Sequence, residues 1–201
     1  MIAIIDYGVG NLFSLSSSLK KIGTEVVVTG DKKTIESADK IILPGVGAFK
    51  DAMQKLTQTG LDKVVIKQAK LGKKILGICL GMQLLFERSF EFGECKGLGL
   101  LKGEIVGMQG VLDKSLKIPH IGWNSLQFKK DSYLNKYIKN GDYVYFVHSF
   151  YASGCEESLV SVAEYQIEIP ATVQSGNVCG CQFHPEKSGD VGLKILKAFC
   201  E

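Results

Sequence analysis

Residues 74–83, Lys-Ile-Leu-Gly-Ile-Cys-Leu-Gly-Met-Gln, form the stretch that decides the fold. Its first half is a short apolar run, which is typical of a buried strand, and Cys79 follows at once. Helix-favouring residues come next, so Cys79 stands at a strand-to-helix junction. Gly77 and Gly81 lie two positions before and two after it. Small residues there allow a sharp turn that strains the cysteine and lets the helix approach the strand closely.

The chain before this junction alternates between strands and helices. Short apolar runs predict strands over 2–6, 25–28 and 40–43, and helices are expected after Asn11, which can cap the first one, and over 48–58 and 61–71. This rhythm predicts a parallel sheet that is covered by helices on both faces.

The chain after about residue 90 is rich in short β segments. They are expected over 103–108, 117–128, 143–149, 159–165, 170–174 and 178–183. Ser175-Gly176 predicts a hairpin between the last two, and a final amphipathic helix begins near Val191. The predicted fold class is therefore α/β: a three-layer sandwich with a central, mostly parallel sheet, a smaller antiparallel portion, and one domain over 1–201.

Composition narrows the classes of function. The 201 residues carry a net charge of +3 that is spread along the chain, so no basic cluster indicates nucleic acid or an anionic membrane. No apolar run approaches the roughly 18 residues that cross a bilayer. The N-terminus reads as a strand and not as a signal peptide. The 6 cysteines are therefore interpreted as reduced thiols in a cytosolic protein.

A second chemical signal is Gln182-Phe-His184-Pro-Glu186. In an extended chain residues two apart point to the same side, so His184 and Glu186 can both face one site. Of the 3 histidines, His184 is the one with a carboxylate at fixed short range. If its strand lies beside that of Cys79, the three residues can form a nucleophile, a base and an orienting acid. Alone, the cysteine and the histidine could each be structural.

Two further features bear on the site. The amide of Leu80 and the loop Gly45-Val46-Gly47 are candidate donors for an oxyanion, although a plain tight turn would also use these glycines. Cys179 and Cys181 share one strand face, but this spacing is unlike that of zinc ligands and no second cysteine pair completes four. They are expected to be core thiols, and no metal is expected.

The chain resembles the class I glutamine amidotransferases. Gly77-Ile-Cys-Leu-Gly-Met-Gln83 and His184-Pro-Glu186 carry the resemblance, which four further segments extend over almost the whole length: Asp6-Tyr-Gly-Val-Gly-Asn11, Pro44-Gly-Val-Gly-Ala-Phe49, Ile118-Pro-His-Ile-Gly-Trp-Asn124 and Tyr145-Phe-Val-His-Ser149. It implies hydrolysis of glutamine by a triad of Cys79, His184 and Glu186, without a cofactor. It also implies that glutamine is held by Gln83 and the backbone of Ser149 and Phe150, beside the oxyanion loop.

Within the family, the chain is similar to the branch that supplies ammonia to a (β/α)8-barrel cyclase of histidine biosynthesis. That likeness implies a heterodimer and assigns four residues to the partner-facing surface near the ammonia exit: Asn11, Trp123, Tyr145 and Lys187. Phe150, where tyrosine is common, Gln166, where glycine is common, and the segment 89–96 depart from the pattern. A paralogous subunit for another synthase, another hydrolase with a cysteine nucleophile, and a silent binding subunit remain as alternatives.

Overall fold

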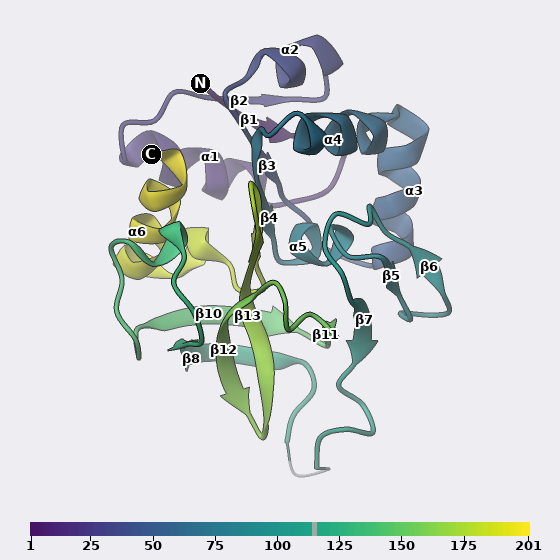
Figure 1. The fold of residues 1–201 in the computed structure, drawn as a ribbon, viewed down its shortest axis with the longest axis vertical. Coiled ribbons are helices and arrows are strands. Elements are labelled where there is room, and N and C mark those ends of the chain that lie inside the picture. The colour runs from purple at the N-terminus through teal and green to yellow at the C-terminus, as the bar shows by residue number, and fades with distance from the viewer. Residues whose placement is uncertain (114–115) are drawn as a thin grey trace.

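A central sheet of eight strands runs through the molecule in the order β2-β1-β3-β4-β14-β13-β12-β9 (Figure 1). The computed structural model describes residues 1–113 and 116–201. β2, β1, β3, β4 and β14 pair in parallel, and β13, β12 and β9 continue the sheet in antiparallel. The strands are β1 (Ile2–Ile5), β2 (Val26–Thr29), β3 (Lys40–Leu43), β4 (Lys74–Ile78), β9 (Gln127–Phe128), β12 (Leu159–Tyr165), β13 (Ile167–Ser175) and β14 (Val178–Cys181).

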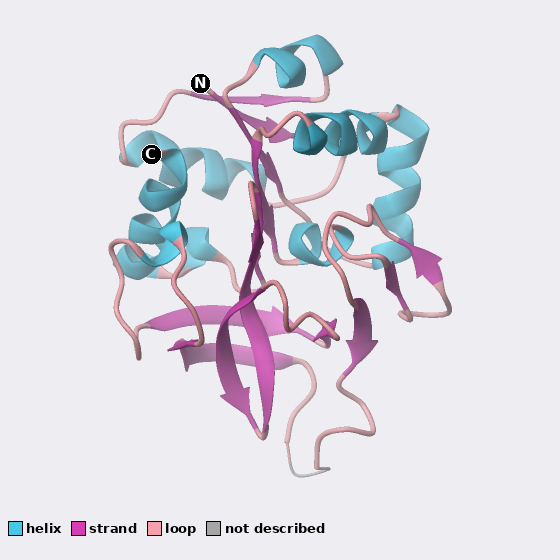
Figure 2. Ribbon diagram, in the orientation of Figure 1, coloured by secondary structure: helices cyan, strands magenta, loops and turns pink. Residues whose placement is uncertain are grey.

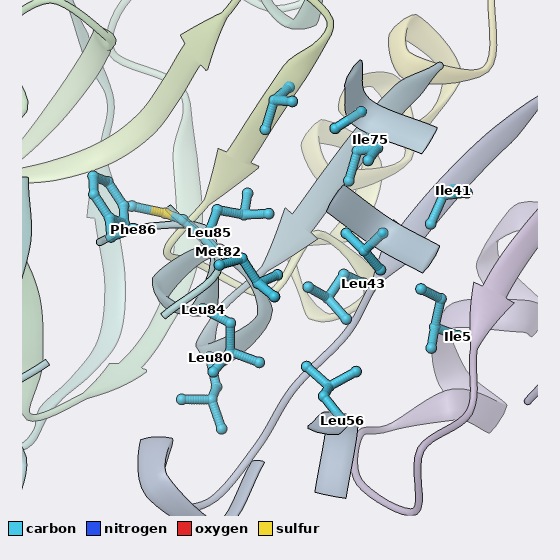
Figure 3. Packing of buried hydrophobic residues seen from close by; sticks show 14 of the residues in the cluster. Ile5, Ile41, Leu43, Leu56, Ile75, Leu80, Met82, Leu84, Leu85 and Phe86 are labelled. Atoms are coloured by element: carbon cyan, nitrogen blue, oxygen red, sulfur yellow. The ribbon is translucent and has the colours of Figure 1, made fainter. Parts of the chain in front are cut away.

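Helices cover both faces of the parallel part of this sheet (Figure 2). One face carries α1 (Leu12–Lys21) and α6 (Gly189–Cys200), and the other carries α3 (Phe49–Thr59), α4 (Leu61–Lys70) and α5 (Leu80–Leu84). Alternate side chains of each strand enter opposite cores. Ile4 packs in the cluster that contains Leu15 of α1, whereas Ile5 packs with Leu56 of α3 (Figure 3). The predicted three-layer α/β architecture is confirmed.

Two smaller sheets are built from the second half of the chain. One pairs β8 (His120–Ser125) with β10 (Tyr143–His148) in antiparallel. The other has the order β11-β7-β5-β6 and contains β11 (Phe150–Ser153), β7 (Glu104–Gly107), β5 (Arg88–Ser89) and β6 (Cys95–Lys96). The predicted β-rich second half is therefore present. The segment 117–128 was expected as one stretch, but it divides into β8 and β9, which belong to different sheets.

Among the local features, a predicted hairpin is confirmed, a predicted helix cap is wrong, and one helix was not predicted. The Ser175-Gly176 hairpin is confirmed, since Ser175 pairs with Val178 across the turn between β13 and β14. Asn11 does stand at the N-cap position of α1, but its side chain forms no capping hydrogen bond. The expected cap was wrong because its backbone (φ −87°, ψ 66°) lies outside the extended region that orients a capping side chain. The helix α2 (Lys32–Ser37) was not predicted.

The described helices are all too short or too polar to span a membrane.

Candidate active site

Cys79 occupies a strained turn between β4 and α5. Its backbone has φ 54° and ψ −114°, a conformation that side-chain-bearing residues rarely adopt. A Cβ on Gly81 would lie 1.9 Å from the carbonyl oxygen of Leu43, and a Cβ on Gly77 would lie 2.6 Å from the Cα of Met82. The two glycines therefore let the helix pack against the strands, as predicted, and the strain on the cysteine is held by the surrounding backbone.

His184 reaches Cys79 because β14 lies next to β4. Cys181 pairs with Ile78, and the amide of Cys79 donates to the carbonyl of Cys181 at 2.8 Å. The Cys79 thiol and the His184 ring then line the same cavity, and the interaction between them raises the pKa of His184. The sequence prediction that both strand ends open at one site is confirmed.

Glu186 holds the other side of the imidazole. His184 Nδ1 lies 2.8 Å from Glu186 Oε1, and the two side chains are only 4% and 3% exposed. The expected extended arrangement was wrong: residues Pro185–Lys187 form a 3-10 helix, η2. The tight turn still places both groups together, because it folds the carboxylate back onto the ring.

The charges of this group favour a protonated imidazole. Burial alone would lower the pKa of His184, but the hydrogen bonds with Cys79 and Glu186 raise it to about 9. Since Nδ1 faces Glu186, Nε2 is the nitrogen that is left for the sulfur. At neutral pH the ring can therefore carry a positive charge between the sulfur and the carboxylate.

Ser188 fixes the turn that carries these two residues, and sequence reasoning missed it. Its hydroxyl donates to the carbonyl of His184 at 2.6 Å and accepts from the amide of Tyr145 at 2.9 Å. The amide of His184 in turn donates to the Tyr145 carbonyl at 3.0 Å. The imidazole is thus attached to β10 through buried backbone contacts.

A cavity of about 390 Å³ opens beside the sulfur. Its lining contains six of the seven residues that were predicted for the oxyanion site and for substrate: Val46, Gly47, Leu80, Gln83, Ser149 and Phe150. Gly45 is not in the lining but supports it, since a Cβ there would lie 2.7 Å from the amide nitrogen of Gly81. Gln83 Nε2 donates to the carbonyl of Phe150 at 3.0 Å, which joins α5 to the opposite wall.

Four lining residues were not predicted: Glu91, Phe92, Val147 and His148. Glu91 lies in the segment 89–96, which departs from the pattern of the family, so no motif identified it. Its Oε2 accepts from the amide of Phe49 at 2.7 Å, at the start of α3. Among the described residues of the lining, it is the one carboxylate. Phe92, with φ 54° and an 83% exposed side chain, stands beside it.

Two of the four predicted partner-facing residues lie on one face of the β8–β10 sheet, and a third lies beside them. Trp123 and Tyr145 are paired across the two strands, with ring centroids 6.2 Å apart, and Lys187 Nζ lies 5.9 Å from the centre of the Tyr145 ring. Trp123 is 55% exposed, and Ile121 and Tyr143 are exposed on the same face. Asn11, half-buried, precedes α1, which contacts η2.

Cys179 and Cys181 are buried in the core on the side of α1 and α6, as expected of structural thiols. Cys179 Sγ lies 3.2 Å from the Ile75 carbonyl, and the hydroxyl of Tyr133 is 2.9 Å from the same sulfur. Burial raises the pKa of Cys179 to about 12, so the thiol stays protonated.

Comparison with known proteins agrees with this geometry. The family model described as "Glutamine amidotransferase class-I" matches residues 3–201. The chain is 55% identical to "Imidazole glycerol phosphate synthase subunit HisH" of Caldanaerobacter subterraneus subsp. tengcongensis, covering 100% of this chain and 98% of the relative. It is 52% identical to the protein of the same name from Bacillus cereus, over 99% of this chain and 93% of the relative.

Solved structures share the fold at lower identity. A structure described as "Crystal structure of glutamine amidotransferase" superposes with a TM-score of 0.77 at 18% identity, covering 99% of both chains. "Structure of PurLQS from Thermotoga maritima" superposes with a TM-score of 0.72 at 23% identity, over 98% of this chain and 96% of that one. With the match of the family model over nearly every residue, the chain belongs to the class-I glutamine amidotransferases.

Proposed function

We propose that this chain is the glutaminase subunit of an imidazole glycerol phosphate synthase. It hydrolyses glutamine to glutamate and ammonia and passes the ammonia to a cyclase subunit that makes imidazole glycerol phosphate and AICAR in histidine biosynthesis. The observation that carries the activity is the buried pair of His184 and Glu186, 2.8 Å apart, which shares one cavity with Cys79 at its strained turn. The relatives at about half identity over the full length support the pathway.

Acylation begins from a thiolate on Cys79 and a protonated His184. The sulfur attacks the side-chain amide carbon of glutamine, and a tetrahedral oxyanion forms. The amide of Leu80 and an amide of the Gly45–Gly47 loop are the assigned donors to this oxygen. The carbon–nitrogen bond breaks as His184 Nε2 gives its proton to the departing nitrogen, so ammonia leaves and a γ-glutamyl thioester remains.

In deacylation His184 accepts a proton instead of donating one. A water molecule attacks the thioester carbon while the neutral His184 takes its proton. The carbon–sulfur bond then breaks, glutamate leaves, and the thiolate and the protonated imidazole are restored. Glu186 stabilises the positive ring in each half-reaction and keeps Nε2 directed at the sulfur, so no cofactor is required.

Recognition of glutamine is assigned to the rest of the lining. Gln83 and the backbone at Ser149 and Phe150 hold the substrate along the wall opposite the sulfur. Glutamine also carries an α-ammonium group, and a buried cation needs a nearby anion. The Glu91 carboxylate meets this need, because one of its oxygens accepts from the amide of Phe49 and the other is left for the ligand.

A separate cyclase subunit is the assigned consumer of the ammonia. Free ammonia is mostly protonated near neutral pH, so the consuming site must lie close to the site of release. The exposed aromatic face at Trp123 and Tyr145 lies directly beside η2, through the backbone bonds of Tyr145 with His184 and Ser188. Trp and Tyr are frequent anchors of protein interfaces. A heterodimer with a (β/α)8-barrel partner, with Asn11 and Lys187 at the rim, is the corresponding proposal.

Residues 1–201 form one domain, which is supported by β14 from the end of the chain inserting between β4 and β13. The protein works in the cytoplasm, which is supported by six free cysteines, typical of a reducing compartment.

The test is glutamine turnover by the chain together with its cyclase partner. Cys79→Ala should abolish the release of glutamate, whereas Cys95→Ala, a half-buried cysteine outside the cavity, should leave it unchanged. A glutamine-like electrophile should label Cys79 and no other cysteine. Residual turnover in Cys79→Ala would refute the assigned nucleophile. Cleavage of simple esters or peptides that is independent of Gln83 would favour a different hydrolase.

A further inference from the structure

Two of the three histidines have no part in the mechanism above, yet both are buried, and His148 lines the cavity. His120 on β8 and His148 on β10 face each other across the antiparallel pair, on the side of the sheet that turns away from Trp123. His120 Nδ1 lies 3.1 Å from His148 Nε2. The ring of His120 is also stacked between Tyr165 and Phe146, with centroid distances of 4.2 and 4.8 Å.

The hydrogen bonds of these rings fix one tautomer for each. His148 Nδ1 lies 2.9 Å from the carbonyl of Phe150, which can only accept, so Nδ1 carries the hydrogen. Burial lowers the pKa of His148 to about 3, so its Nε2 is an acceptor at neutral pH and must receive its bond from His120. Burial likewise lowers the pKa of His120 to about 4. Its Nε2 therefore accepts, and the partner 3.3 Å away is Asn124 Nδ2.

The result is a series of hydrogen bonds that all donate in one direction, toward the Phe150 carbonyl. It starts at Asn124, whose amide nitrogen also donates to the Glu164 carbonyl at 2.9 Å, and whose oxygen accepts from Ser125 at 2.8 Å. It passes through the two imidazoles and ends at the Phe150 carbonyl. The two imidazoles are buried and Asn124 is half-buried, and a network in which every member is hydrogen-bonded is rigid, because any rotation leaves a polar atom unpaired.

The last hydrogen bond of this series, from His148 to the Phe150 carbonyl, lies at the side of the cavity formed by Ser149 and Phe150. It joins His148 to a residue two positions later, so it spans the bend at Ser149 where β10 ends and β11 begins. The same Phe150 carbonyl accepts from Gln83, one turn after the nucleophile. Two side chains thus converge on one oxygen, and they set the distance between the helix of Cys79 and the opposite wall.

We propose that Asn124, His120 and His148 form a fixed hydrogen-bond relay that positions the Ser149–Phe150 wall of the cavity for glutamine. They are positioning residues, since Asn124 and His120 act through His148, and His148, which also lines the cavity, holds the Phe150 carbonyl. The inference rests on the proposed function for the identity of the ligand. Because the wall contacts glutamine before and during the reaction alike, loss of the relay should raise KM and leave kcat nearly unchanged.

Two variants at one position separate the relay from simple packing. His148→Leu removes both hydrogen bonds, and KM for glutamine should rise by about 5- to 10-fold, the loss expected for one or two hydrogen bonds. His148→Asn keeps a donor near the place of Nδ1, and its KM should stay within about 3-fold of the wild type. kcat should change by less than about 2-fold in both.

Val144→Ala is the matched control. Val144 is buried on the same face of β10 but makes no polar contact, so its truncation should lower Tm and leave KM unchanged. Adding His120→Phe to His148→Leu should raise KM no further, because the two act in series. An unchanged KM in His148→Leu, or an equal rise in Val144→Ala, would overturn the proposal.

A second measurement does not depend on catalysis. In the ¹⁵N-histidine-labelled chain, the ring nitrogens of His120 and His148 should show neutral Nδ1–H tautomers from pH 5.5 to 8. An Nε2–H tautomer, or protonation near pH 6.5, would show that the relay does not exist. If the wild-type complex does not hydrolyse glutamine, the proposed function fails, whereas this spectrum still decides on the relay.

Discussion

Acidification from pH 6.5 to 5.0 should cost the fold much of its stability, and His120 and His148 should be the cause. Burial holds the pKa of these residues at about 4 and about 3 in the folded chain, against about 6.5 when unfolded. Below pH 6.5 the unfolded chain therefore binds more protons than the folded chain. The contribution of the two neutral, buried imidazoles to the free energy of unfolding is complete above pH 6.5. It is lost as the pH falls toward their pKa values in the folded chain.

The size of the effect follows from proton linkage. Between pH 6.5 and 5.0, each of the two histidines should remove about 1.6 kcal/mol from the free energy of unfolding. His184 acts in the opposite direction, because its pKa is raised to about 9. Its contribution is nearly complete below pH 6.5 and returns only about 0.4 kcal/mol over this interval. The net loss should be about 3 kcal/mol, a large share of the roughly 5 to 15 kcal/mol of a typical domain.

Urea denaturation at the two pH values measures this loss directly. The interval stops at pH 5.0 because the carboxylates with lowered pKa, such as Asp31 and Glu36, stay ionised in both states above it. The matched control is the double variant His120→Gln/His148→Asn, which has neither titrating ring and should lose less than about 1 kcal/mol over the same interval. A loss below about 1 kcal/mol in the wild type, or an undiminished loss in the double variant, would refute the reasoning.

Three further predictions concern the turn, the triad and the pocket. Gly81→Ala should destabilise the chain by more than about 3 kcal/mol in urea, since its Cβ would overlap a backbone oxygen, whereas Gly72→Ala, with open space around it, should cost only about 1 kcal/mol. Glu186→Gln should move the alkaline limb of kcat/KM, set by the imidazole near pH 9, down by about 1 to 2 pH units, because a charge-assisted hydrogen bond is lost; an unmoved limb would contradict it. Glu91→Gln should raise KM for glutamine about 10-fold with little change in Tm, while the exposed Glu94→Gln should not; equal values would remove Glu91 from substrate binding.

The main architecture could be predicted from local pattern because each parallel strand is a short apolar run followed by a turn. β3 (Lys40–Leu43) and β4 (Lys74–Ile78) lie where the sequence placed them, since a strand covered on both faces leaves a continuous apolar signal. The turn at Cys79 was also predictable, because only glycine tolerates the close backbone contacts on either side. The sequence did contain a signal for helix α2: Asp31, a favoured N-cap residue, accepts from the amide of Thr34 and caps this helix.

What sequence pattern did not predict depends on which strands become neighbours. His120 and His148 stand 28 residues apart, and only the register of β8 against β10 brings their rings together. Glu91 reaches the cavity through an irregular loop that has no periodicity to read, and Ser188 acts through backbone atoms. In each case the partner is defined by tertiary contact and not by spacing along the chain.

This difference between the residues has a physical basis. A nucleophile at a strand end needs small neighbours in the sequence and a base on an adjacent strand. Each of these requirements produces a short motif with fixed spacing. The residues that hold the wall and the turn in place need only a complementary atom at hydrogen-bond distance, which many side chains on many elements can supply. A single sequence therefore identifies the reacting groups more readily than the positioning ones. It follows that variants of His148 should test the structure more severely than variants of Cys79, because their effect depends on contacts that only the fold creates.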